Sequence, residues 1–447
     1  MDLIGLIPSF GNVIFTIAVF IIALSVIVAI HEYGHYIVGR WSGIHADVFS
    51  IGFGPVLYAR TDKRGTQWQV AALPLGGYVK FKGDANAASA PDGAAIEGMS
   101  DAETRQTMQG APLWARSATV AAGPIFNFIL SIIVFTGLVF YSGLPGDPMR
   151  VGDINPVPFG ETSLQPGDQI LDIAGEPAPT TLEEFAPWSL ALPNERTLPY
   201  VVLRDGQELT FEAPHPAPAL VGEVLPQSAA IDNRLEEGDV ILAIDGDEIA
   251  TFEELRGIVG ASEGREMRLS IWRSGETLEV SFAPRQIDQP LADGSFETRW
   301  LLGIAQARLF EDERRSAGIG EAVSIAAAST YSIVQNSLST LYHMAAGAIS
   351  SCNLSGPVRI AETSGQIASQ GLDRFIQFIA VLSTAIGLIN LFPIPVLDGG
   401  HLVFHAWEAV SGKPPSDRAL RVLMTAGLTV VLAFMSLALA NDLFLCP

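Results

Sequence analysis

The chain has 447 residues, of which 49% are hydrophobic and only 17% are charged. A chain of this length can form several domains, but it is too apolar to be purely soluble, so we expect a polytopic membrane protein. The formal net charge of −22 argues against nucleic-acid binding, which requires a basic surface to neutralise phosphates.

The first predicted element is an apolar segment that ends in a candidate metal-binding motif. Residues 11–30 are twenty positions without a charge, and His31-Glu32-Tyr33-Gly34-His35 follows them. No Lys or Arg precedes this segment and no small-residue cleavage site follows it. We therefore expect residues 1–40 to form a retained transmembrane helix rather than a signal peptide.

The two histidines of this motif are spaced for metal binding. Side chains at i and i+4 lie on one face of a helix, where two imidazoles can bind one Zn²⁺ while the intervening Glu32 activates a water. The alternative is a pair of ordinary helix histidines. We favour the metal, because imidazoles and a carboxylate beside hydrocarbon are costly unless they have a function.

Residues 41–112 are predicted to form a β region followed by a loop. Short alternating stretches between residues 46 and 82, with a turn at 62–65, indicate a β-hairpin. It is either a small cytosolic sheet or a sheet that enters the membrane beside the metal, where a free edge near residues 70–79 could bind a substrate strand. Residues 84–112 are rich in Ala, Gly and Ser and indicate a flexible loop.

Three more apolar segments predict transmembrane helices, which makes four in all. They are residues 117–146, 375–397 and 422–441, within the segments 113–146, 372–412 and 413–447. Within the first of them, Gly123 and Asn127 lie on one helix face, a spacing that more often indicates close helix packing than chemistry.

The distribution of basic residues predicts the orientation in the membrane. Eight Lys and Arg residues lie from Arg40 to Arg116, and Lys413, Arg418 and Arg421 lie between the third and fourth helices. By the positive-inside rule both segments face the cytoplasm. The middle region and both termini are then expected on the opposite side.

The middle region contains an internal repeat. The stretch Leu164–Leu171, with the sequence LQPGDQIL, recurs 71 residues later as LEEGDVIL at Leu235–Leu242, and residues 202–209 are echoed by 271–278. The Leu-x-x-Gly-Asp-x-Ile-Leu pattern resembles the PDZ domain. We therefore expect two tandem PDZ modules of mixed α and β structure, residues 147–218 and 219–290. Such modules bind extended peptides by strand addition, or they act here as a bulky filter.

Residues 291–371 are predicted to be a linker followed by an amphipathic helix. Residues 321–351 are helical and fairly apolar, with aromatic and aliphatic residues at near-helical spacing. A fifth crossing would place the end of the 375–397 span on the face opposite His35. A helix lying along the outer membrane surface fits better.

The third transmembrane helix ends in a segment that can complete the metal site. Pro393 and Pro395 break the helix, as happens at membrane depth mainly where a segment lines a cavity. The topology brings Asp398 to the level of the two histidines, so two His and one carboxylate leave an open position, as in catalytic zinc sites. The alternative is that Asp398 only caps the following helix. For His401 and His405 we favour supporting or interfacial roles.

Several motifs, in this order, resemble one known family. They are HExxH at 31–35, Gly-Phe-Gly-Pro at 52–55, Leu-Gly-Gly-Tyr-Val-Lys at 75–80, Gly-Pro-x-Phe-Asn at 123–127, the tandem PDZ pattern, Asn-Leu-Ser-Gly-Pro at 353–357 and Asn-x-x-Pro-x-Pro-x-Leu-Asp-Gly-Gly at 390–400. Together they resemble the site-2 protease family of intramembrane zinc metalloproteases, over nearly the whole chain.

The resemblance implies roles for individual residues. His31, His35 and Asp398 match the zinc ligands of the family, and Glu32 matches its general base. Substrate-positioning roles are implied for Asn390, Pro393, Pro395, Asn127, Gly76 and Gly77.

The resemblance also implies a function. It is regulated intramembrane proteolysis of single-span membrane proteins, of the anti-sigma-factor type, or of remnant signal peptides, after a first cut outside the membrane. The implied location is the bacterial inner membrane, with the PDZ modules and both termini in the periplasm.

Two other function classes stay open from the sequence. One is a membrane-anchored PDZ scaffold with a vestigial metal site. The other is a zinc transporter, which is disfavoured because the second and fourth apolar segments offer almost no polar path across the bilayer.

Overall fold

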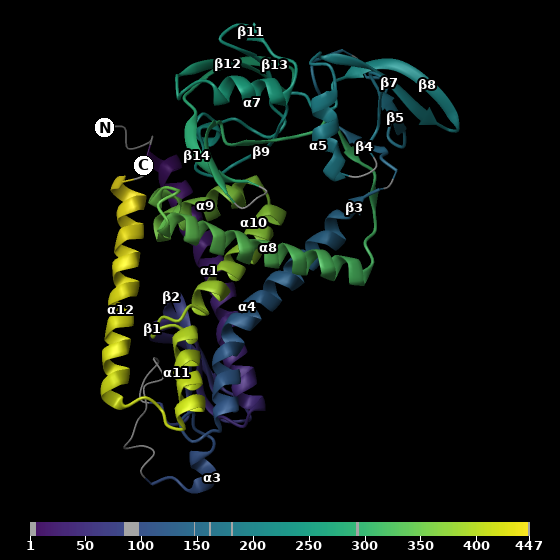
Figure 1. Ribbon diagram of the computed structural model, residues 1–447. Helices are drawn as coiled ribbons and strands as arrows, with labels where there is room; N and C mark the ends of the chain where they lie inside the picture. The colour runs from purple at the N-terminus through teal and green to yellow at the C-terminus, as the bar shows by residue number, and fades with distance from the viewer. Residues whose placement is uncertain are drawn as a thin grey trace. The chain divides into compact units, whose positions relative to one another are not determined.

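The computed structural model describes residues 6–84, 98–146, 148–160, 162–179, 182–291 and 295–445 (Figure 1). The chain forms two compact units. Unit 1 comprises residues 1–138, 320–346 and 350–447, and unit 2 comprises residues 139–319 and 347–349. Both predicted periplasmic termini, at residues 1–5 and 446–447, lie outside the described residues.

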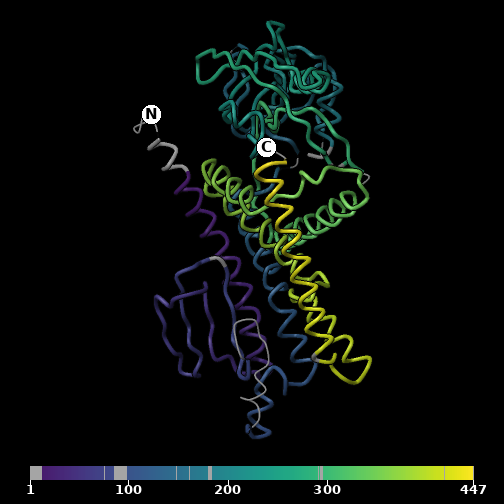
Figure 2. Tube along the Cα trace, turned by 90° about the vertical axis from the view of Figure 1, so that its left-hand side faces the viewer, coloured from purple at the N-terminus to yellow at the C-terminus, as the bar shows by residue number. Residues whose placement is uncertain are grey.

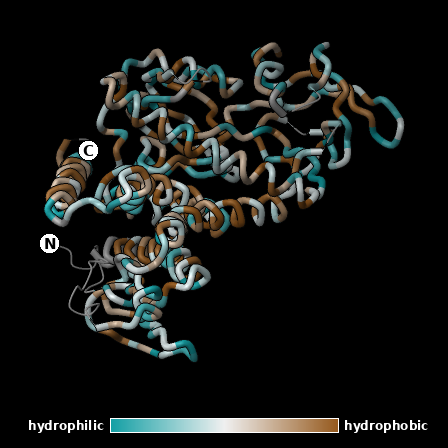
Figure 3. Tube along the Cα trace, turned by 60° about the horizontal axis from the view of Figure 1, so that its bottom comes forward, coloured by the Kyte–Doolittle hydropathy of each residue, from teal (hydrophilic) through white to brown (hydrophobic). Residues whose placement is uncertain are grey.

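The four expected transmembrane helices are confirmed as helices of sufficient length and apolarity. They are α1 (Leu6–Trp41), α4 (Leu113–Ser142), α10 (Leu372–Asn390) and α12 (Asp417–Ala440), which continues into a short π-helical turn at Asn441–Leu445. Most apolar side chains of α12 are exposed. In Figure 3 the tube of the helix nearest the C label is mostly brown, the colour of hydrophobic residues. Outward apolar side chains on a long helix are what a lipid environment requires.

The region after α1 is a sheet built from two long, bent strands, β1 (Ala46–Thr61) and β2 (Gln67–Phe81). Each strand pairs twice, so the order of extended segments is 77–81, 46–51, 67–71 and 56–61. The bend in β1 uses Gly52, whose φ of 89° favours glycine and where a Cβ would lie 2.8 Å from the Leu73 carbonyl oxygen. Figure 2 shows this sheet, in purple and blue, beside α1.

The strand register shows that fewer residues than expected can form the substrate-binding edge. Val70 pairs with Ile51 on one side and with Tyr58 on the other, so it cannot accept another strand. Among the described residues, segment 77–81 pairs only with 46–51 and leaves its other edge open. The edge available beside α1 is therefore 77–81 rather than the whole of 70–79.

The sheet is fixed to the end of α1 by an aromatic cluster. Tyr36 of α1 packs against Phe49 and Trp68, with ring centroids 5.8 and 5.0 Å away. Burial of these rings holds β1 and β2 against the helix that carries the two histidines.

Part of the predicted loop at 84–112 is helical. Residues 85–97 lie outside the described residues, whereas Asp101–Thr104 form α3. Ser100 and Glu103 close a reciprocal capping box at its start, which gives this short helix local support.

The segment predicted to be amphipathic forms α8 (Ile319–Ala345), which is not among the helices apolar enough to cross a membrane in the described part of the chain. Small residues face inward: Ala326 packs with Phe135 of α4 and Ala380 of α10. Tyr331 and Tyr342 are 68% and 70% exposed. Figure 1 shows α8 lying across α4 and α10 rather than alongside them.

The Asn-Leu-Ser-Gly-Pro motif begins α9 (Pro357–Gln370), and the end of the chain's last helix caps it. The Asp442 carboxylate accepts hydrogen bonds from the backbone N–H groups of Gly356, Val358 and Arg359, at 2.8, 3.1 and 3.1 Å. A Cβ at Gly356 would lie 2.4 Å from Asp442 Oδ2, so glycine is needed for this approach. The carboxylate also interacts favourably with the helix dipole.

We expect Asp442→Ala to destabilise unit 1 by about 1–2 kcal/mol, because three backbone donors lose their acceptor. The measurement is thermal unfolding of the purified chain in detergent. Asn353→Ala, which removes a side-chain bond in the 3₁₀ turn that precedes α9, serves as a smaller comparison. Equal unfolding temperatures for wild type and Asp442→Ala would show that the cap contributes nothing.

Unit 2 confirms the internal repeat. Each half contains a four-stranded antiparallel sheet of the same order, β6-β5-β7-β8 and β11-β10-β12-β13. The strands are β5 (Gln169–Ile173), β6 (Glu176–Pro177), β7 (Thr197–Arg204), β8 (Gln207–Pro214), β10 (Val240–Ile244), β11 (Asp247–Glu248), β12 (Met267–Arg273) and β13 (Glu276–Phe282). The helices are α5 (Leu182–Ala191), α6 (Ala229–Asp232) and α7 (Phe252–Gly260).

The repeated Gly-Asp has the same structural role in both halves. Asp168 pairs with Arg204 of β7, and Asp239 pairs with Arg273 of β12, each with a closest distance of 2.6 Å. Both carboxylates are almost fully buried. The repetition in sequence therefore preserves a buried ion pair that joins the turn to the neighbouring strand.

Each half is completed by a strand from the end of unit 2. After the hairpin β14 (Arg285–Pro290) and β15 (Phe296–Leu301), β16 (Ile304–Gln306) pairs with β9 (Val221–Val224) and β17 (Phe310–Asp312) pairs with β4 (Val151–Ile154). A last short pair joins β3 (Leu144–Pro145) to β18 (Arg314–Arg315). The segment 304–312 thus extends both sequence repeats.

Candidate metal centre

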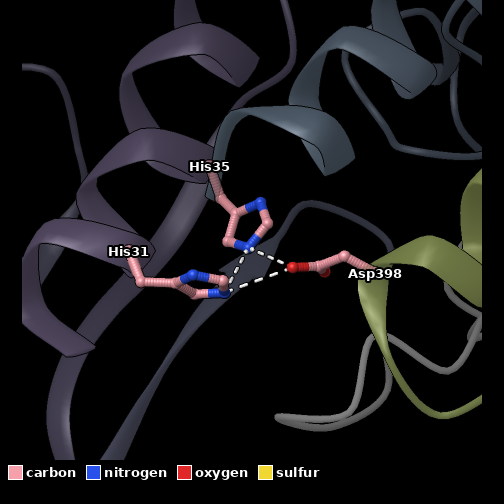
Figure 4. Close-up of side chains that lie close together, drawn as sticks. All are labelled: His31, His35 and Asp398. Carbon is pink, nitrogen blue, oxygen red and sulfur yellow. Dashed lines mark hydrogen bonds and ion pairs between the residues drawn. The ribbon is translucent and has the colours of Figure 1, made fainter. Parts of the chain in front are cut away.

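Three side chains converge in unit 1 as a candidate metal centre (Figure 4). Nε2 of His31 lies 3.2 Å from Nε2 of His35 and 3.2 Å from Oδ2 of Asp398, and the His35–Asp398 distance is 3.5 Å. Ligand bonds of about 2.0–2.1 Å in a tetrahedral zinc site require ligand atoms about 3.3 Å apart. Oδ2 of Asp398 is buried and has no hydrogen-bond partner, so the donor set fits a zinc ion.

The Asp398 side of the site depends on the broken helix. As predicted, the two prolines interrupt the helix, and α11 (Asp398–Ser411) begins after them. The span expected at 375–397 is helical only as far as Asn390, where α10 ends. A Cβ at Gly399 would lie 2.3 Å from the Leu391 and Phe392 carbonyl oxygens, and one at Gly400 would lie 2.3 Å from that of Ile394. The glycines therefore let α11 start directly against the turn, which places Asp398 at the histidines.

Helix α4 shapes the other side of the site. A Cβ at Gly123 would lie 2.3 Å from His35 Nε2 and 2.8 Å from His31 Cε1, so only glycine leaves room for the imidazoles. Nδ1 of His35 lies 2.8 Å from the Thr119 carbonyl oxygen, to which it donates. That bond leaves the lone pair of Nε2 directed at the centre.

Glu32 lies between the triad and the open sheet edge. Its carboxylate accepts a hydrogen bond from the Val79 backbone, and a Cβ at Gly77 would lie 3.1 Å from Glu32 Cγ. The absence of a side chain at Gly77 therefore allows the 77–81 edge to approach α1 closely.

A cavity of about 620 Å³ opens onto these groups. Of the predicted site residues, its lining includes His31, Glu32, His35, Asp398, Asn390 and Gly77. The described lining does not include Gly76, Pro393, Pro395 or Asn127. Both His401 and His405 line the cavity, beyond the triad along α11.

The sequence did not reveal a polar cluster that joins α4 to α11 in this cavity. Arg116 and Glu408 form a two-fold ion pair with distances of 2.6 and 3.1 Å, and Ser117 lies 3.2 Å from Nδ1 of His405. The partners are about 290 residues apart and belong to no motif, so no local pattern could have predicted the contact.

We expect Glu408→Gln to destabilise unit 1 by about 3 kcal/mol, because Arg116 keeps its charge in a site where its side chain is only 16% exposed. The double variant Arg116→Met, Glu408→Met should recover most of this loss, since no unpaired charge is left. Thermal unfolding of the double variant and of the single variants Arg116→Met and Glu408→Met measures the coupling. Additive effects of the two substitutions would contradict a stabilising pair.

Comparisons with known proteins agree over almost the whole chain. The family described as Peptidase family M50 matches residues 19–434. A relative from Agrobacterium fabrum, named as a zinc metalloprotease, is 36% identical over 426 residues, covering 95% of this chain and 94% of its own. The regulator of sigma-E protease RseP of Salmonella typhimurium is 31% identical over 466 residues, covering 96% of this chain and 99% of its own.

Proposed function

The chain belongs to peptidase family M50, the site-2 proteases, and is a zinc-dependent membrane endopeptidase, and we propose that His31, His35 and Asp398 hold its zinc while Glu32 is the general base. The observation that supports this assignment is the triangle of ligand atoms, with sides of 3.2, 3.2 and 3.5 Å. A scaffold with a vestigial site has no need to keep three donors in this arrangement.

The residues divide the chemistry between them. Zinc, when bound, supplies the Lewis acidity that polarises a peptide carbonyl and acidifies a water. Glu32 would accept a proton from the water that adds to the carbonyl carbon, and would deliver it to the amine released when the peptide C–N bond breaks. Glu32 and the three proposed ligands line the same cavity, which supports this assignment of roles.

The open edge at 77–81 is proposed to bind the substrate as an added strand. A transmembrane helix hides its scissile carbonyl in an internal hydrogen bond, so it must unwind before attack. Main-chain pairing with 77–81 would hold it extended, beside Glu32. Asn390 lines the same cavity, donates its side-chain amide to Ile386 at 3.0 Å and keeps its side-chain oxygen for a substrate backbone donor.

Pro393, Pro395 and Gly76 are proposed to position substrate indirectly. The two prolines form the turn against which α11 starts, and this turn sets where Asn390 and Asp398 lie. Gly76 has a φ of 145°, and a Cβ there would lie 2.4 Å from the Phe53 ring, so it shapes the start of the open edge.

The substrates are proposed to be single-span membrane proteins already trimmed outside the membrane, of the anti-sigma-factor type, or remnant signal peptides. The name of the Salmonella relative, regulator of sigma-E protease, supports the first class. The two repeats of unit 2 are proposed to be PDZ modules that bind peptide ends or act as a filter. The similarity to the Salmonella protease supports a bacterial inner-membrane location. The distribution of Lys and Arg supports an orientation with the repeats and both termini in the periplasm.

The test is cleavage of a membrane-embedded single-span peptide by the purified chain. Cleavage should stop when a chelator removes the metal and return when Zn²⁺ is added back. Trimmed and untrimmed forms of the same peptide test the substrate proposal, since only the trimmed form should be cut. A chain that cleaves equally in excess chelator would contradict the zinc assignment.

A further inference from the structure

Asn127 is buried at the back of the metal site. Its residue is 0% exposed and does not line the described cavity, so substrate cannot reach it. The side-chain Nδ2 lies 3.2 Å from Nδ1 of His31, and its Oδ1 is buried with no hydrogen-bond partner. A buried amide oxygen without a partner is costly and calls for an explanation.

The choice of which His31 ring nitrogen carries the proton explains this unpaired oxygen. Nε2 of His31 is the atom that faces His35 and Asp398, so a neutral ring that offers this lone pair to a metal carries its proton on Nδ1. Nδ1–H then needs an acceptor. Rotating the Asn127 amide by a half turn exchanges its oxygen and nitrogen within the same shape and places Oδ1 on Nδ1–H.

His35 shows the same arrangement on the same helix. Its Nδ1 donates to the Thr119 carbonyl oxygen at 2.8 Å. Thr119 and Asn127 are eight residues apart on α4, about two helical turns, and Gly123 between them leaves room for both rings. One face of α4 therefore offers an acceptor to each imidazole.

The backbone of Asn127 is itself held in place. Its carbonyl oxygen accepts hydrogen bonds from the Ser131 and Ser383 hydroxyls, at 3.0 and 2.9 Å. On α10, a Cβ at Gly387 would lie only 3.1 Å from Asn127 Cβ, so the two helices meet closely at this level. The backbone of Asn127 is therefore held in a fixed position, from which its side-chain amide can orient the His31 ring.

Building on the proposed zinc site, we infer that Asn127 is a positioning residue: its side-chain oxygen accepts from His31 Nδ1–H and fixes the ring with Nε2 toward the metal. This role differs from the substrate contact that the family resemblance implied for Asn127. Residues that support a metal ligand in this way typically change metal affinity by 10–100-fold when they are replaced.

The test is the zinc affinity of the purified full-length chain, measured by competition with a chromophoric chelator. Asn127→Leu keeps a similar volume without an acceptor and should weaken zinc binding about 10–100-fold. Asn127→Asp keeps an acceptor oxygen and should bind zinc nearly as tightly as the wild type, and therefore more tightly than Asn127→Leu. The matched control is Thr136→Ala, farther along α4, which loses a hydroxyl bond to the Ile132 carbonyl oxygen and should leave zinc affinity unchanged.

The outcomes separate this inference from the zinc site itself. Wild-type affinity in Asn127→Leu, or equal weakening in the Leu and Asp variants, would show that Asn127 only packs the helices. Zinc binding that is also unaffected by Asp398→Ala would instead overturn the proposed site. If Asn127→Leu does not fold, Asn127→Ala, which also lacks an acceptor, should show the same loss of affinity.

Discussion

Glu32→Gln is expected to bind zinc as the wild type does and to cleave substrate about 10²–10⁴-fold more slowly. Glutamine has nearly the same shape as glutamate but cannot accept the proton from water. Glu32 also lies outside the three-ligand group, so metal binding should be unaffected. The measurement is the cleavage rate of a membrane-embedded peptide, with the zinc content of the same preparation.

Tyr33→Phe is the matched control for this variant, since Tyr33 is the next residue of the motif and is 38% exposed. It should cleave at the wild-type rate. A Glu32→Gln variant that cleaves normally would show that Glu32 has no role in the mechanism. It would also favour the alternative function, a membrane-anchored PDZ scaffold. A variant that has lost its zinc would instead make Glu32 part of the metal site.

Gly123→Ala is expected to abolish zinc binding and cleavage together. The added methyl group would lie 2.3 Å from His35 Nε2, a distance at which the ring must move away from Asp398. Zinc content and peptide cleavage are the two readouts.

Gly137→Ala provides the control on the same helix. A Cβ at Gly137 meets nothing within 4 Å, so this variant should keep full zinc content and activity. It should also be no less stable, because alanine favours a helix over glycine. Normal zinc binding in Gly123→Ala would mean that the histidines do not need the space that glycine provides.

The transmembrane helices and the metal triad could be predicted from the sequence because each depends on a simple constraint. A bilayer requires about 20 apolar residues for a helix, and four such segments are visible directly. Counting the membrane crossings then places His31 and Asp398 at the same depth in the bilayer. In the structure, His31 Nε2 and Asp398 Oδ2 are 3.2 Å apart. No pairing between distant side chains had to be guessed.

Features that depend on register or on distant packing could not be predicted. The double pairing of β1 and β2, which leaves only 77–81 open, is decided by bends at glycines rather than by the alternation that predicted a hairpin. The strands at 304–312 that complete both halves of unit 2 follow an intervening hairpin. Likewise, the spacing of Gly123 and Asn127 indicated helix packing, whereas only the three-dimensional contacts place Asn127 against His31.

The central claim is that His31, His35 and Asp398 form one zinc site from segments about 360 residues apart in the sequence. It is tested most directly by the zinc stoichiometry of the purified wild-type chain and of Asp398→Ala. We predict one zinc per wild-type chain, and in Asp398→Ala a loss of both zinc and cleavage, because two imidazoles alone hold the ion weakly. An Asp398→Ala chain that retains a full zinc equivalent and cleaves at the wild-type rate would contradict this account.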